Sequence, residues 1–135
     1  MSHKGGGVGV VTVVDPYTLA FPSYDGNGMF LSLGNILETR NVGLLFVDFI
    51  RQTRLRVNGV AALADSPELL ASFAGADLVV RVNVQEVFPN CSRYVHKYEL
   101  VERSRYVPKP NITPPVPAWK ESSWAADVLA AHKPK

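Results

Sequence analysis

The fold is decided by residues 21–49, FPSYDGNGMFLSLGNILETRNVGLLFVDF, which join a turn-rich opening, a segment with helical spacing and an apolar run. Residues 22–28 contain two glycines, an Asn and an Asp, a composition typical of a loop. Large apolar side chains then recur at helical spacing over residues 28–39, and Asn27 is a suitable N-cap. Residues 42–50 are almost wholly apolar, as a strand covered on both faces would be. The stretch therefore predicts a loop, a helix and a buried strand.

The rest of the chain is dominated by short strands. β-branched composition or strict alternation predicts strands at residues 8–14, 18–21, 54–63, 77–88 and 97–104. Asp15 and Pro16 predict a turn between the first two, and Ser66 with Pro67 predicts the start of a short helix. Strands joined by short turns favour a mainly β fold, a small β-barrel with short helices, over a layered α/β fold.

Composition limits the function classes. The 135 residues are enough for one domain, and a net charge of +2 gives no sign of a nucleic-acid or membrane surface. No apolar run approaches the roughly 20 residues that span a bilayer. The single cysteine, Cys91, excludes an internal disulfide and is typical of a reduced compartment, so a cytoplasmic protein is expected. His3, His96 and His132 lack metal-ligand spacing, which predicts no metal site.

The chain divides into two parts on composition. Residues 1–108 carry the strands and predict the barrel domain, whereas residues 109–135 begin as a Pro-rich arm and end in a helical pattern. Trp119 and Trp124 are expected to anchor that arm in the core of the barrel, with attachment to a partner subunit as the alternative. Asp48, a charge inside an apolar run, is expected to pair with a strand arginine.

The beginning of the helix over residues 28–39 has a polar side. Gly28, Ser32 and Asn35 recur at intervals of three or four residues and so line one face. First-turn amides have no partner inside a helix and carry partial positive charge, which suits a phosphate. On pattern alone the ordinary alternative, a capped surface helix whose polar side meets water, is favoured.

Four blocks of the sequence resemble a known family. SHKGG (2–6), SYDGNGMFLSLGNILETRNVGLLFVDF (23–49), RLRVNGVA (54–61) and NCSRYVHKYELVERSRYVP (90–108) are similar to the pyridoxamine 5′-phosphate oxidase-like, flavin-binding split-barrel proteins, in particular to an uncharacterised bacterial branch. The resemblance implies a six-stranded split β-barrel of the FMN-binding type. It also implies a homodimer with one flavin mononucleotide (FMN) in each of two clefts at the subunit interface.

The resemblance also implies cofactor-binding residues. Near the phosphate or the ribityl chain it places Lys4, with His3 as a weaker candidate, and the helix start with Asn27, Gly28, Ser32 and Asn35. Beside the flavin ring it places Arg54 and Arg56.

Genuine oxidases carry a glutamine at about the position of Arg54. An arginine there could stabilise negative charge on reduced flavin, although a solvated strand face explains Arg54 and Arg56 equally well. The C-terminal arginine motif that holds the vitamin's phosphate has no counterpart here, which argues against pyridoxamine 5′-phosphate oxidation.

Three functions follow as hypotheses. The first is a dimeric FMN-dependent oxidoreductase whose small-molecule substrate the sequence does not identify, with deazaflavin as an alternative cofactor. The second is a non-catalytic module that binds or sequesters a flavin or deazaflavin on the same fold. The third is a structural dimer without a ligand.

Overall fold

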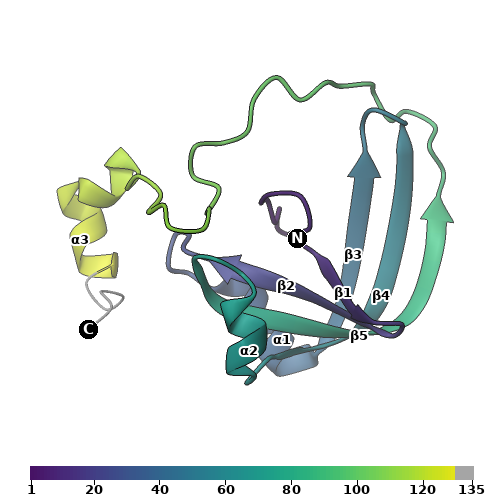
Figure 1. The fold of residues 1–135 in the computed structure, drawn as a ribbon, viewed down its shortest axis with the longest axis horizontal. Coiled ribbons are helices and arrows are strands. Elements are labelled where there is room, and N and C mark those ends of the chain that lie inside the picture. Colours follow the sequence, from purple (N-terminus) through teal and green to yellow (C-terminus); the bar gives the residue numbers. More distant parts are fainter. Residues whose placement is uncertain (130–135) are drawn as a thin grey trace.

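One antiparallel sheet makes up most of the computed structural model, which describes residues 1–129 (Figure 1). Its strands, in the spatial order β1-β2-β5-β4-β3, are β1 Thr12–Asp15, β2 Thr18–Tyr24, β3 Asn41–Asp48, β4 Thr53–Leu63 and β5 Ala76–Asn90. The helices are α1 Leu31–Thr39, α2 Pro67–Ala71, the 3₁₀ helix η1 Ala118–Glu121 and α3 Ser123–Leu129. No helix within residues 1–129 has the length and apolarity to cross a membrane.

The long strand β5 determines the shape of the sheet. Its first half pairs with β2, and from Val80 onward it pairs with β4, so the sheet curves as β5 passes from one group of strands to the other (Figure 1). The expected mainly β class is confirmed: the protein is built on one curved antiparallel sheet with short helices. Within residues 1–129 the sheet has five strands, one fewer than the family resemblance implied.

Two apolar clusters hold the helices on the sheet. Leu33 and Ile36 of α1 are buried against a sheet face that consists of Phe21, Ala61, Val80 and Val82. Full burial of a side chain of this size contributes about 1.5–3 kcal/mol. A smaller cluster, Ala20, Phe73 and Val79, lies at the α2 end. The first cluster fixes the position of α1, and with it the start of the helix.

Two local predictions are confirmed by hydrogen bonds. Asp15 Oδ1 accepts from the backbone N–H of Tyr17 at 2.8 Å, which closes the β1–β2 turn and holds the pKa of Asp15 below its usual value. Ser66 Oγ accepts from the N–H of Leu69 at 3.2 Å at the start of α2, with Pro67 in the first turn.

The predicted start of the first helix was wrong. The helix begins at Leu31, not at residue 28, and its N-cap is Phe30, which adopts left-handed backbone geometry (φ 48°). Asn27 is not the N-cap, because its Oδ1 accepts from the N–H of Met29 at 3.1 Å inside the preceding loop. Turn chemistry at Asn27 therefore delays the helix.

The loop that was predicted from residue 22 also begins later, because β2 continues to Tyr24. Pro22 pairs with Val79 of β5. The pairing between β1 and β2 ends at Ala20, so at Pro22 the β1 side of β2 has no neighbouring strand. The missing N–H of Pro22 therefore removes no hydrogen bond from the sheet.

Two strand predictions need correction. β3 is not covered on both faces: its side chains alternate between exposed and half-buried, because β3 is an edge strand with one face open. Residues 97–104 form no strand, although their pattern alternates. They are exposed, and the N–H of Tyr98 donates to the carbonyl of Phe49 at 3.2 Å without a continuing ladder.

Two side-chain predictions were also wrong. Trp119 and Trp124 are 38% and 67% exposed and stack on each other, with ring centroids 5.9 Å apart, instead of entering the core. Asp48 pairs with Arg51 of the β3–β4 turn, with Oδ2 3.7 Å from Arg51 Nη1, and not with an arginine of β4. It accepts from the N–H groups of Ile50 and Arg51 and so closes the β3–β4 turn.

Candidate functional site

The start of α1 is open to an anion. The helix has no acidic residue in its first turn and no side-chain cap at Phe30. The N–H groups of Leu31, Ser32 and Leu33 therefore have no partner inside the helix, and they carry the positive end of its dipole. Packing of the helix gives no reason for this arrangement, since a helix that only packs would normally carry a capping side chain here.

The opening of the chain contacts the same turn. The hydroxyl oxygens of Ser2 and Ser32 lie 2.7 Å apart. Lys4 follows two residues after Ser2 and is exposed. The structure thus brings Ser2 to the predicted phosphate end, and Lys4 stays a candidate by its place two residues further along the chain.

The remaining predicted residues of the phosphate end lie on the loop before α1 or on its next turn. Asn27 and Asn35 are exposed, whereas Gly28 is half-buried. Gly28 has a φ of 73°, and a Cβ built on it would lie 3.4 Å from Leu129 of α3. The helix start is therefore accessible to solvent on the side of the loop and is bordered by the C-terminal helix.

A hollow of about 630 Å³ lies beside the chain opening. The opening residues His3 and 5–8 form one wall, Tyr24 and Asp25 form a second, and part of residues 100–108 forms a third. Partial burial raises the pKa of Tyr24 above its usual value, because it disfavours the charged phenolate.

The predicted ring end lies on β4. Arg54 and Arg56 alternate along the strand and so share one face of the sheet, opposite Asn90 of β5. Arg56 Nε donates to Asn90 Oδ1 at 3.4 Å, and Arg54 Nη2 donates to the carbonyl of Cys91. Arg54 Nε is buried and has no hydrogen-bond partner within the described chain. A buried guanidinium N–H without an acceptor is costly, so this atom calls for an acceptor from a ligand or from a second chain.

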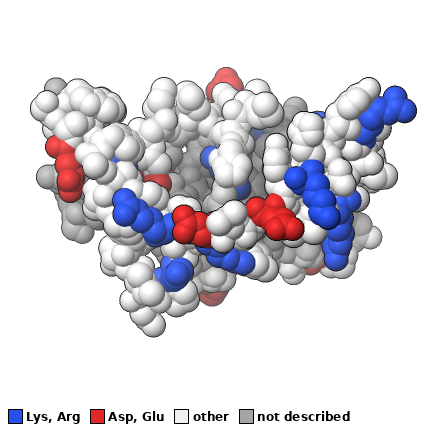
Figure 2. Space-filling model, turned by 90° about the horizontal axis from the view of Figure 1, so that it is seen from above, with Lys and Arg blue, Asp and Glu red and all other residues white. Residues whose placement is uncertain are grey.

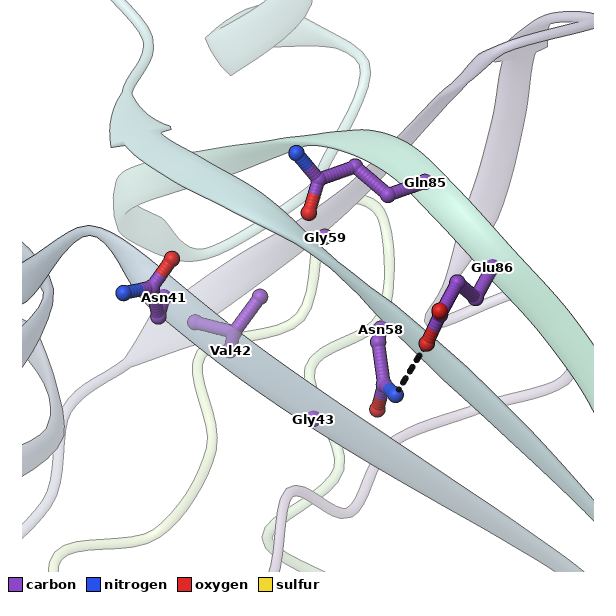
Figure 3. Close-up of a pocket in the computed structure, with 7 residues that line it drawn as sticks. All are labelled: Asn41, Val42, Gly43, Asn58, Gly59, Gln85 and Glu86. Carbon is purple, nitrogen blue, oxygen red and sulfur yellow. Dashed lines mark hydrogen bonds between the residues drawn. The ribbon is translucent and has the colours of Figure 1, made fainter.

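A shallow basin of about 650 Å³ continues this face toward the middle of the sheet (Figure 3). It is lined by Asn41, Val42, Gly43, Asn58, Gly59, Gln85 and Glu86. Asn58 Nδ2 donates to Glu86 Oε2 at 2.9 Å across the two strands. Gly43 pairs with Asn58, and a Cβ built on Gly43 would lie 3.3 Å from Asn58 Oδ1 and 3.6 Å from Arg56 Nη1.

The sequence analysis missed Asn41, Gln85 and Glu86 as residues of this face. Asn41 begins β3, and a bulge brings Gln85 and Glu86 there: the register between β4 and β5 shifts between Asn58 and Gly59, so that Gln85 has no direct partner. A Cβ on Gly59 would lie only 2.3 Å from the carbonyl oxygen of Asn83, so glycine is required at this crossing. The glycines inside β3 and β4, Gly43 and Gly59, were the sequence signal for an irregular, closely packed part of the sheet.

The two groups of predicted residues are far apart within one chain. The carbonyl of Arg40, which ends α1, accepts from the N–H of Ala61 near the far end of β4. Arg54 lies at the other end of β4, a distance of roughly 23 Å from Ala61 at ~3.3 Å per residue. Figure 1 shows the same separation between α1 and the β3–β4 turn. The structure brings together the residues of each group but does not join the groups.

Other chemistry has little support in residues 1–129. No group of three or more metal-ligating side chains occurs in them, and His132 lies outside the described residues. Cys91 is exposed, with Sγ 3.4 Å from the N–H of Arg93. Acidic and basic side chains are mixed on the face that Figure 2 shows, with no continuous basic field.

Solved structures share this fold. HupZ from Group A Streptococcus has a TM-score of 0.51 and 17% sequence identity, over 67% of this chain and 74% of that one. A variant of HupZ in which one histidine is replaced by alanine has a TM-score of 0.50 and 19% identity, over 60% and 73%. A Lactobacillus delbrueckii protein named provisionally as a pyridoxamine 5′-phosphate oxidase has 28% identity and a TM-score of 0.48, over 59% and 68%. No protein-family model matches the sequence, and neither does any curated protein.

Proposed function

We propose that this protein binds FMN as a homodimer of the split-barrel class and acts as an oxidoreductase on a small molecule. The observation that carries the proposal is the start of α1, which has neither an acidic residue nor a capping side chain and is met by the chain opening through Ser2 and Ser32. Such a turn is suited to a phosphate group. The first-turn amides, Ser32 and Lys4 would hold the FMN phosphate, with Asn27, Gly28 and Asn35 beside them.

The ring end is supported by Arg54. Its buried Nε lacks an acceptor within the described chain, and a flavin carbonyl would supply one. Arg54 and Arg56 would then stabilise negative charge near the pyrimidine part of the ring. FMN, when bound, supplies hydride or electron transfer, and the protein supplies binding, orientation and charge.

The homodimer is supported by the end of the sheet near the β3–β4 turn. Apolar side chains are exposed there on both faces: Leu45 (46%) and Phe88 (37%) on the arginine face, Leu55 (41%) and Val87 (57%) on the other. Exposed apolar residues grouped in this way are typical of a protein interface. A second copy also resolves the separation within one chain, because the α1 start of one subunit can meet the β4 face of the other.

Titration with FMN tests the proposal. Purified protein should bind about one FMN per chain. The bound flavin should absorb at about 450 nm and lose this absorbance when a donor reduces it. Bound flavin that no nicotinamide donor and no substrate panel reduces would favour a binding or sequestering module. Tighter binding of a deazaflavin than of FMN would identify the alternative cofactor. Absence of binding to either would contradict the proposal.

A further inference from the structure

The C-terminal strap, defined as η1 and α3 (Ala118–Glu121 and Ser123–Leu129), touches the loop that leads into α1. Lys120 Nζ donates to both carboxylate oxygens of Asp25, 95 residues earlier in the chain. Leu129 contacts the position where a side chain on Gly28 would begin. Figure 1 shows α3 standing away from the sheet at the end of a long connector. The strap is therefore attached through the loop that borders the predicted phosphate end.

Lys120 is unusually well covered for a surface lysine. Its side chain is 12% exposed, whereas that of Asp25 is 74% exposed. The ammonium group lies 5.5 Å from the ring centroid of Trp119, which in turn stacks on Trp124. The stacked tryptophans shield the ammonium from water, and shielding strengthens an ion pair relative to one that is fully solvated.

The charge of Asp25 would oppose the binding of a phosphate at the start of α1. Its carboxylate lies on the same short loop as Asn27 and Gly28, just before a helix start that is otherwise free of acidic residues. A phosphate bound at α1 would be repelled by this charge. Within residues 1–129, Lys120 is the cation that pairs with Asp25, and it is delivered by the strap.

We infer that the strap completes the phosphate site: Lys120 cancels the charge of Asp25, so that docking of the strap and binding of the phosphate favour each other. The inference rests on the proposed function, because the phosphate is that of FMN. The coupling is reciprocal by linkage: bound FMN stabilises the docked strap by the same free energy by which the docked strap stabilises bound FMN.

The connector allows the strap to leave. Residues 97–117 form no named strand or helix, and the hydrogen bonds within them are local, such as Val107 N–H to Ser104 and Ile112 N–H to Lys109. The strap is thus held through side-chain contacts and not through a backbone ladder. Ala125 of α3 is fully buried, so packing also holds the strap. Removal of the ion pair should loosen the strap without unfolding the sheet.

Trypsin tests the docked strap without any flavin. The initial rate of cleavage after Lys120 is measured on intact chains by mass spectrometry for the wild type, Asp25→Asn and the control Asp65→Asn, which removes a carboxylate just before α2. Asp25→Asn should raise the rate about tenfold, the effect of losing one charge-assisted contact, and Asp65→Asn should leave it unchanged. Equal rates in all three proteins would contradict the claim that the Lys120–Asp25 ion pair holds the strap.

FMN affinity then tests the coupling. Lys120→Met should weaken FMN about tenfold, Asp25→Asn should bind like the wild type, and the double variant should recover wild-type affinity. The control Lys97→Met, an exposed lysine of the connector, should have no effect. A double variant as weak as Lys120→Met would overturn charge cancellation, since Lys120 would then contact the phosphate itself. If the wild type binds no FMN, the proposed function and the coupling fail together, while the trypsin rates still decide whether the strap is held.

Discussion

The hydroxyl of Ser2 contacts the hydroxyl of Ser32 across 30 residues of sequence, with 2.7 Å between the two oxygens. This contact places the opening of the chain on the first turn of α1. The helix itself is fixed by Leu33 and Ile36, which are buried against the sheet. The core thus positions a helix start whose first amides have no partner inside the helix, and the chain opening brings a serine hydroxyl to it.

Ser32→Ala should weaken FMN binding by roughly ten- to a hundredfold, because a hydrogen bond to a charged group contributes about 1.5–3 kcal/mol. The matched control is Thr39→Ala in the last turn of the same helix, whose hydroxyl donates to the Asn35 carbonyl. Fluorescence titration measures both affinities. Equal losses in the two variants would show that the effect is general to the helix and not specific to its start.

Arg54→Met should lower the midpoint potential of the bound flavin by roughly 30–60 mV. The variant loses a charge-assisted contact to the reduced ring of about 1.5–3 kcal/mol, and 30 mV corresponds to about 1.4 kcal/mol for two electrons. Arg81→Met, which removes an exposed arginine of β5 far from the β3–β4 turn, is the control. An unchanged potential after Arg54→Met would remove Arg54 from the ring end.

Val87→Lys should convert the proposed dimer to a monomer of 14.8 kDa, since it places a charge on the exposed apolar end of the sheet. Light scattering measures the mass, and FMN binding should fall with the dimer. Val101→Lys, on the connector and 95% exposed, should stay dimeric. A dimer that survives Val87→Lys must use another surface.

Gly59→Ala should destabilise the fold by at least about 2 kcal/mol, because its Cβ would lie 2.3 Å from the carbonyl oxygen of Asn83. Gly34→Ala in α1 meets no atom within 4 Å and should instead stabilise the protein by about 0.5–1 kcal/mol. Urea denaturation compares the two variants with the wild type. A neutral Gly59→Ala would mean that β4 and β5 do not cross so closely at the bulge.

Local turn and capping chemistry was predictable from the sequence. Asp15 and Ser66 act through backbone N–H groups two and three residues ahead, so the sequence contains both partners. The start of α1 was not predictable in the same way. Asn27 can cap a helix or close a turn, and the sequence does not decide between the two; in the structure it closes a turn, and the helix begins at Leu31.

Features that depend on pairing between distant residues could not be predicted from the sequence. The alternation of residues 97–104 has the pattern of a strand, but no neighbouring strand continues a ladder with it in the described part of the chain. The bulge that brings Gln85 and Glu86 beside Asn58 exists only once β4 and β5 are in register. The contact between Lys120 and Asp25 spans 95 residues, and no local pattern predicts it.

Mass spectrometry of the small molecules released by denaturation is the most direct test of the claim that FMN binds at the start of α1. The protein is incubated with FMN, freed of unbound ligand by gel filtration and then denatured. Wild-type protein should release about one FMN per chain, and Ser32→Ala should release far less. Release of neither FMN nor a deazaflavin by the wild type, with no absorbance change on titration, would contradict it.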